Sequence, residues 1–217
     1  MLLAASRVFA RKGYWEATNA DICREAEVNT ASVSYHFGGK DNLYAEAWKC
    51  SFQKSLERHP PDGGAAADAS AEERLHARIL SFMQHVSDPE SYDIDILQRE
   101  MGNPTGLVTQ VNEEAMRVIE QGFRSLAQEL LGPGASKKQV DLCQMSIMTQ
   151  CMDPMLRARL IDGAVGPGEA VPPFGIEELA DHITRFSLAG IRSIRESGAE
   201  VERARKRRRP SRTRRNT

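Results

Sequence analysis

Apolar residues recur three or four positions apart along almost the whole chain, and this spacing is the feature that most restricts its fold. Such a period places apolar side chains on one face of a helix, whereas a half-buried strand needs alternation at every second position. Alternating Val, Ile and Thr over five or more positions is hard to find, and only 6% of the residues are aromatic. The pattern therefore predicts an all-α protein, and 217 residues with 41% hydrophobic content suffice for an ordinary core.

Glycine and proline divide this helical pattern into segments. The first clear boundary is the run HPPDGG at residues 59–64, which follows three short helices and one longer helix. Beyond it we expect helices over about 70–87, 90–102, 104–131, 136–162 and 176–197. The sequence thus predicts a small N-terminal domain, a larger helical domain and a C-terminal tail, with bounds 1–58, 59–198 and 199–217.

The end of the chain is strongly basic. Of the 29 basic and 30 acidic residues, nine basic and two acidic ones lie in residues 199–217. The preceding 198 residues therefore hold 20 basic and 28 acidic side chains, a net charge of −8. Clustered Arg and Lys cannot pack into a core, and they attract phosphates and other anions. We expect a disordered tail, and two roles stay open for it: a solubilising segment or an arm that binds nucleic acid.

The sequence carries no signal for a membrane, for secretion or for a metal site. No apolar run approaches the roughly 20 residues that a membrane span needs. The N-terminal stretch MLLAASRVFARKGY is too broken by Arg and Ser to be a signal peptide. The four cysteines are scattered, without a C-x-x-C pair or a neighbouring histidine cluster. We therefore expect a cytoplasmic protein with core thiols and without metal.

The stretch NTASVSYHFGGKDNLY, residues 29–44, is poor in side chains that fill a core. Two short helices joined by a tight turn, the second beginning with small polar residues, are typical of a helix whose N-terminus enters the DNA major groove. Bulky side chains there would keep the backbone away from the bases. The side chains that can approach base edges are Thr30, Ala31, Ser32 and Ser34, and those that reach further, toward phosphates, are Tyr35, His36 and Lys40. The pattern predicts a DNA-binding helix-turn-helix domain over residues 1–58.

These residues also carry a resemblance. The run VNTASVSYHFGGKDNLY, preceded by FARKGY and ADICREA, resembles the DNA-binding domain of TetR-family transcriptional repressors over residues 1 to about 50. The resemblance implies a homodimer that binds a palindromic operator in double-stranded DNA, and a larger domain in which a small-molecule effector alters operator affinity. Carried over by position, it implies base-facing roles for Thr30, Ala31 and Ser34 and phosphate-facing roles for Thr18, Ser32, Tyr35, His36 and Lys40.

Parts of the larger domain resemble the CecR-type subgroup of this family. They are REMGNPT at 99–105, DLCQMSIMTQCM at 141–152 and the final amphipathic helix, and they carry the resemblance together with NTASVSYHFGGK of the N-terminal domain. Because that subgroup is associated with efflux and antibiotic-sensitivity genes, the resemblance implies control of efflux or drug-response genes.

Two features depart from the family. The chain opens at Met1 inside what resembles the middle of the family's first helix, without a basic arm, so we expect a start codon further upstream or a frayed helix end. The basic tail is not a family feature, and it could supply the electrostatic attraction that the arm gives elsewhere.

The two long C-terminal segments carry rich apolar faces. These faces comprise Val140, Cys143, Ile147, Cys151 and Met155 in the first segment and Leu179, Ile183, Phe186, Leu188, Ile191 and Ile194 in the second. Pairing with the same two helices of a second copy would bury both faces in a four-helix bundle, so we expect a twofold homodimer. The alternative is that both faces pack inside one subunit.

An effector pocket is expected among the helices between residues 70 and 160. Methionine and phenylalanine supply an adaptable apolar lining, and a few polar groups orient the ligand. The expected ligand-binding residues are Phe82, Met83, Arg99, Met116, Phe123, Met148 and Met152. The alternative is that these side chains simply form the core.

Motifs for enzymatic chemistry are missing from the sequence. It contains no Gly-rich phosphate loop, no G-x-S-x-G, no H-E-x-x-H and no EF-hand pattern. We therefore expect no catalytic residues and no cofactor. The main alternative to a DNA-binding regulator is a helical protein–protein adaptor that does not bind DNA, and binding to duplex DNA with its salt dependence separates the two.

Overall fold

The computed structural model describes residues 1–29, 31–162 and 174–208, and their side chains except those at 31–32, 155–162 and 199–208. Over these ranges the chain forms nine α-helices and no strand, which confirms the all-α prediction. The helices are α1 (Leu2–Glu16), α2 (Asn19–Glu25), α3 (Ala31–Phe37), α4 (Lys40–Arg58), α5 (Ala71–Ser87), α6 (Tyr92–Gly102), α7 (Thr109–Leu131), α8 (Lys137–Asp162) and α9 (Ile176–Arg208). None of these helices, over the residues described, is long and apolar enough to cross a membrane.

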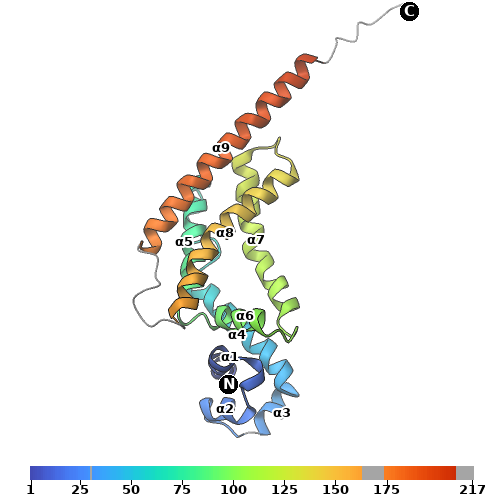
Figure 1. Cartoon of the computed structure of the whole chain (residues 1–217), viewed down its shortest axis with the longest axis vertical. Helices are drawn as coiled ribbons and strands as arrows, with labels where there is room; N and C mark the ends of the chain where they lie inside the picture. The colour runs from blue at the N-terminus through green and yellow to red at the C-terminus, as the bar shows by residue number, and fades with distance from the viewer. Residues whose placement is uncertain (30, 163–173, 209–217) are drawn as a thin grey trace, which may run out of the picture.

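The helices α1 to α3 gather at one end of the molecule around the start of α4 (Figure 1). The helical path of α1 is broken at Gly13, whose φ of 72° is a value that glycine adopts at little cost. Thr18 caps α2: its side chain accepts a hydrogen bond from the Asp21 N–H, and the Asp21 side chain accepts one from the Thr18 N–H. Two fully buried side chains, Phe9 and Ile22, lie in the core of this unit.

A buried polar network fixes α4 to α5 and α6. The indole of Trp48 donates to the backbone oxygen of Asp93 over 3.1 Å. The hydroxyls of Ser51 and Ser55 donate to the Asp93 carboxylate over 3.2 and 2.7 Å, and the other carboxylate oxygen lies 2.8 Å from His85 Nε2. Because each polar group here has a partner, burying the carboxylate is tolerated, and α4 is held as a rigid connection.

The boundary expected after residue 58 falls at the end of α4. However, α1 and α4 both pack against α6, so the two expected domains share an extensive contact. The division of the chain into domains therefore stays a prediction.

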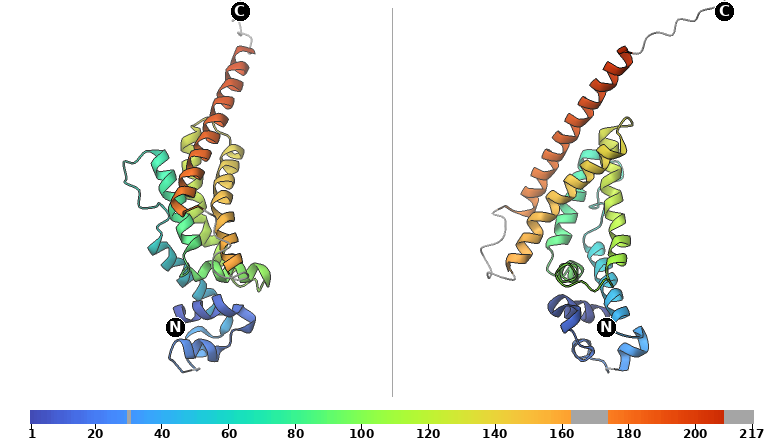
Figure 2. Two further views of the ribbon diagram at one scale, coloured as in Figure 1. Left: turned by 60° about the vertical axis from the view of Figure 1, so that its left-hand side comes forward. Right: turned by 45° about the vertical axis from the view of Figure 1, so that its right-hand side comes forward.

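The larger part of the molecule is built from α5, α7, α8 and α9, which pack along one another (Figure 2). The expected dimer faces of α8 and α9 are largely covered by α5 and α7 of the same chain. The buried members are Val140, Cys143, Ile147, Cys151, Ile183 and Ile191. The expectation that these residues meet a second copy is therefore wrong. Phe186 has 62% of its surface exposed, Leu179, Leu188 and Ile194 are partly buried, and the Met155 side chain lies outside the described residues.

The basic C-terminal segment differs from the disordered tail expected over 199–217. Helix α9 continues through residues 199–208, and its end lies at the opposite end of the molecule from α1 to α3 (Figures 1 and 2). Its sequence explains the helix, because Ala, Glu, Arg and Lys are good helix formers and Glu202 stands four positions before Lys206. The expectation of disorder is thus wrong for 199–208, while 209–217 lie outside the described residues.

Candidate functional site

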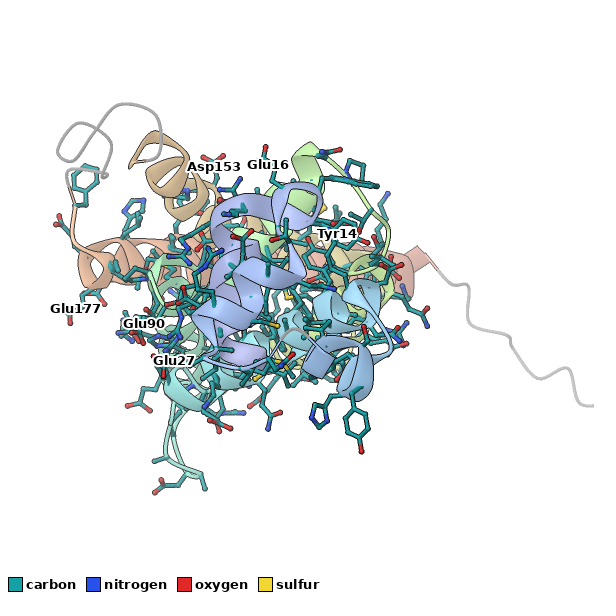
Figure 3. All side chains as sticks on the ribbon, turned by 90° about the horizontal axis from the view of Figure 1, so that it is seen from below. Tyr14, Glu16, Glu27, Glu90, Asp153 and Glu177 are labelled. Atoms are coloured by element: carbon teal, nitrogen blue, oxygen red, sulfur yellow. The ribbon has the colours of Figure 1, made fainter. Side chains whose placement is uncertain are left out.

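Helix α3 presents an exposed polar face at the end of the molecule formed by α1 to α3, which Figure 3 views from below. Val33 is fully buried and anchors the helix, whereas Ser34, Tyr35 and His36 are exposed. Tyr35 has 85% of its surface exposed, and its ring lies 4.9 Å from that of His36. Of the other residues expected to face DNA, Thr30 lies outside the described residues, and so do the side chains of Ala31 and Ser32.

The turn before α3 is fixed by backbone hydrogen bonds. The N–H groups of Glu27 and Val28 donate to the carbonyl oxygens of Arg24 and Cys23, the pattern of a Schellman motif at the end of α2. Glu27, labelled in Figure 3, takes the left-handed position with φ of 55°, which is unusual for a residue that is not glycine. This turn sets the direction in which α3 leaves α2.

Lys40 lies at the start of α4, where a phosphate contact was expected. Its ammonium donates to the backbone oxygens of Tyr14 and Ala17 over 2.9 and 3.0 Å and lies 4.2 Å from the centre of the Tyr14 ring. Tyr14 in turn donates to Asp41, and this hydrogen bond raises the pKa of Tyr14 to about 12. Lys40 thus fixes α4 to the end of α1, and its expected contact with a phosphate stays a prediction.

Thr18, the other expected phosphate contact in this region, is exposed, and its hydroxyl takes part in the cap of α2. The basic side chains of α1 and α2 are paired with acidic ones. The ion pairs are Arg7–Glu25, Arg11–Glu25, Lys12–Asp21 and Arg24–Asp21. Hydrogen bonds from Lys12 and Thr18 hold the pKa of Asp21 below its ordinary value. Three of these pairs join α1 to α2 and hold the two helices against each other.

Arg99 joins α6 to α1, and its expected role as a ligand contact stays a prediction. Its guanidinium donates to the backbone oxygens of Ala10 and Arg11, next to the break at Gly13. These are carbonyls near the end of a helical segment, which need donors from elsewhere. The polar group that we expected to orient an effector therefore ties α6 to α1.

Glu100, the next residue, is buried and joins α6 to α4. Its carboxylate accepts hydrogen bonds from the Tyr44 hydroxyl over 3.1 Å and from the N–H groups of Thr105 and Gly106, each over 2.7 Å. Burial, and secondly the Glu100 carboxylate, raise the pKa of Tyr44. The motif at 99–105 thus forms the junction between the two parts of the molecule.

The other expected ligand-binding residues belong to the core or its edge. The buried ones are Phe82, Met83, Phe123 and Met148, and the partly buried ones are Met116 and Met152. Phe82 packs edge-on against Phe123, with ring centres 5.8 Å apart. Phe82 also lines a cavity of only about 10 Å³, too small for an effector. As candidate ligand contacts, these residues stay a prediction.

An open groove of about 490 Å³ lies elsewhere, between α5, α7 and the segment 62–67. None of the seven expected ligand-binding residues lines it. Its lining includes Arg74 and Arg78 from α5 and Val118, Gly122 and Leu126 from α7. Sequence reasoning missed these residues, although a glycine in the interior of a long helical pattern is a signal of close packing or function.

Two models of known protein families match the chain, one in each of its two parts. The sequence profile described as "Bacterial regulatory proteins, tetR family" matches residues 1–47, and "HTH-type transcriptional dual regulator CecR, C-terminal domain" matches residues 71–191. No curated protein matches the chain.

Several solved structures share the fold. A putative transcriptional regulator from Pseudomonas aeruginosa PAO1 is 20% identical, with 88% of this chain and 89% of that chain covered and a TM-score of 0.69. FadR from Bacillus subtilis, in complex with stearoyl-CoA, is 17% identical, with coverage of 87% and 97% and a TM-score of 0.67. AibR, in complex with isovaleryl coenzyme A and operator DNA, is 16% identical, with coverage of 85% and 94% and a TM-score of 0.63. The CecR-type match spans more than half of the chain, and together with the N-terminal match it shows that this protein belongs to the TetR family of transcriptional regulators, with a CecR-type C-terminal domain.

Proposed function

We propose that this regulator is a repressor that binds a palindromic operator as a homodimer and whose operator affinity changes when a small molecule binds the larger domain. The observation that carries the proposal is the exposed face of α3, with Ser34, Tyr35 and His36 presented from a helix anchored by Val33. A helix-turn-helix protein places such a helix in the major groove. AibR, which shares the fold, has been crystallised with operator DNA.

The outward faces of α8 and α9 support a dimer, with different residues from those expected. Leu142 and Met145 on α8 have 46% and 57% of their surfaces exposed, and Phe186 on α9 has 62%. The exposed stripe around Phe186 contains no Asp, Glu, Lys or Arg, and its members are His182, Phe186, Ala189, Gly190 and Ser193. Pairing these faces about a twofold axis would remove the exposed apolar side chains from water.

Effector binding would reach the DNA-binding unit through α6 and α7. The segment 103–108 joins these helices, and its Thr105 and Gly106 are bonded to Glu100. Glu100 is bonded to Tyr44 near the start of α4, the end around which α1 to α3, the proposed DNA-reading unit, gather. A shift of α7 would therefore tilt α4. In the proposed dimer, this tilt would change the distance between α1 to α3 of one copy and α1 to α3 of the other. A hundredfold change in operator affinity requires about 2.7 kcal/mol of coupling free energy.

The genes controlled are proposed from the subgroup alone. The match to a CecR-type C-terminal domain, together with the resemblance of the motifs at 99–105 and 141–152, supports efflux or drug-response genes as targets.

Selection from a random duplex library, followed by sedimentation of the protein with the enriched duplex, tests the proposal. We expect a palindrome whose half-site centres lie about 34 to 36 Å apart, bound by two copies of the chain. An adaptor that does not bind DNA would enrich no duplex, and a protein that stays monomeric on an asymmetric site would contradict the dimer.

A further inference from the structure

The groove between α5 and α7 contains an arginine without a hydrogen-bonding partner. Arg78 is half-buried, and among the described residues its guanidinium forms no hydrogen bond or ion pair. Its Nε is shielded from solvent. Burial lowers the pKa of Arg78, because desolvation disfavours the charged form. A folded chain keeps such a group at a cost in stability, so its retention points to a ligand.

The other charges of the groove do not satisfy Arg78. The negative charge of Asp62 opposes the lowering of the Arg78 pKa, but Asp62 forms no ion pair with Arg78. Its carboxylate instead accepts a hydrogen bond from the Gly64 N–H over 3.0 Å. Arg74 is bonded to Glu129 over 2.6 Å. Within the described lining, Arg78 is therefore the cation whose donors stay available.

Because Gly122 has no side chain, it leaves room for the guanidinium of Arg78. A Cβ at this position of α7 would lie 2.0 Å from Nη1 of Arg78, which is too close for both atoms. Glycine is a poor residue for the interior of a helix, so its presence in the middle of α7 calls for a local reason. The Arg78 guanidinium also lies 5.9 Å from the centre of the Phe123 ring, an aromatic face that favours a cation.

Apolar surface lies beside this charge. Val118 and Leu126 line the groove from α7, and the alanines of segment 65–67 lie opposite them. A volume of about 490 Å³ falls within the roughly 300 to 1,000 Å³ of small-molecule sites. The groove thus combines one unsatisfied guanidinium with room for an apolar chain.

We propose that this groove is the effector site and binds an amphipathic oxyanion, with Arg78 holding its carboxylate or phosphate and Val118 and Leu126 contacting its apolar part. The planar guanidinium matches both kinds of oxyanion through paired N–H donors. This assignment rests on the proposed function, because it names the chemical class of the effector.

Calorimetric titration of the full chain with three probes of equal chain length tests the class of ligand. Octanoate, octyl phosphate and 1-octanol differ only in the head group. The anion that binds more tightly shows whether the site prefers a carboxylate or a phosphate. We expect at least one anion to bind at least about tenfold more tightly than octanol, because a charge-assisted hydrogen bond is lost with the alcohol. Equal binding of octanol, or no binding of either anion, would overturn the proposal.

Two variants test the site itself. Arg78→Gln removes the charge, while Gly122→Ala keeps it but displaces the guanidinium, and each should weaken binding of the anion at least about tenfold. Gly122→Ala should melt no lower than the wild type, because Ala is the better helix former. Arg117→Gln makes the same charge change at an exposed position outside the groove lining and should bind the anion like the wild type.

Duplex binding without ligand separates this proposal from the proposed function. All three variants should bind the selected duplex like the wild type. If both groove variants bind the anion as tightly as the wild type does, the anion binds elsewhere and the proposed site is wrong, even if DNA binding is intact. Failure of the wild type itself to bind any duplex would instead contradict the proposed function.

Discussion

The hydroxyl of Tyr44 donates a hydrogen bond to the buried carboxylate of Glu100 over 3.1 Å, and this bond joins α4 to α6. The same carboxylate holds the segment that leads into α7 through the N–H groups of Thr105 and Gly106. One buried side chain therefore contacts both α4 and the segment that leads into α7, the helix that lines the groove. We therefore expect a change at α4 or at α7 to alter the hydrogen bonding of Glu100 and to reach the other helix through it.

Tyr44→Phe should lower the free energy of unfolding by about 1 kcal/mol, because one donor to a buried carboxylate is lost while the others remain. Urea denaturation at neutral pH measures this. Tyr35→Phe is the matched control, since the Tyr35 side chain is 85% exposed, and it should leave the stability unchanged. Equal stability of both variants would show that the bond to Glu100 contributes nothing.

Glu27→Gly should raise the stability by up to about 1 kcal/mol, because φ of 55° crowds a residue that has a Cβ. Glu27→Ala keeps the Cβ and should bring no such gain. Thermal unfolding of the two variants side by side makes the comparison. A glycine variant no more stable than the alanine variant would mean that the turn after α2 is not strained.

Asp21→Asn should destabilise the protein at neutral pH, because Asp21 accepts from Lys12 and caps α2 with Thr18. The pKa of Asp21 is held below its ordinary 3.8, so the stabilisation is present above that pH and is lost as the pH falls further. Unfolding curves from pH 7 down to about pH 3 should therefore show the gap between wild type and variant narrowing below about pH 4. Glu113→Gln, an exposed substitution on α7, is the control. A gap that is independent of pH would contradict the role of the ionised carboxylate.

Phe186→Asp should give a folded monomer, because the ring is exposed in the single chain and belongs to the outward face of α9. Ile191→Asp should instead lower the stability by about 3 kcal/mol or more, since it places an unpaired charge in the core. Sedimentation and circular dichroism distinguish the two results. A dimeric Phe186→Asp protein would move the interface away from this face.

Local signals allowed much of the helical framework to be predicted. The break expected at residues 59–64 depends on Pro and Gly close in sequence, and α4 ends just before it, at Arg58. Periodicity also revealed the apolar faces of α8 and α9. It could not reveal which neighbour covers each face, and α5 and α7 of the same chain cover Ile147 and Ile191.

The sites depend more on contacts between distant residues. Arg99 looked like a polar group of a pocket, but its partners are backbone oxygens of α1, which no side-chain pattern reports. Gly122 was visible as an interior glycine, but its meaning depends on Arg78 from another helix. Methionines predicted to line a pocket are indistinguishable in sequence from methionines that fill a core, as Met83 does.

The salt dependence of binding to the selected duplex tests the central claim most directly. Fluorescence anisotropy titrations between about 50 and about 200 mM salt give the slope of log Kd against log salt concentration. A regulator whose two α3 units lie in successive major grooves contacts several phosphates, so its affinity should fall by about a hundredfold or more over this range. A protein that binds no duplex, or whose weak binding does not change with salt, would contradict the account and favour an adaptor.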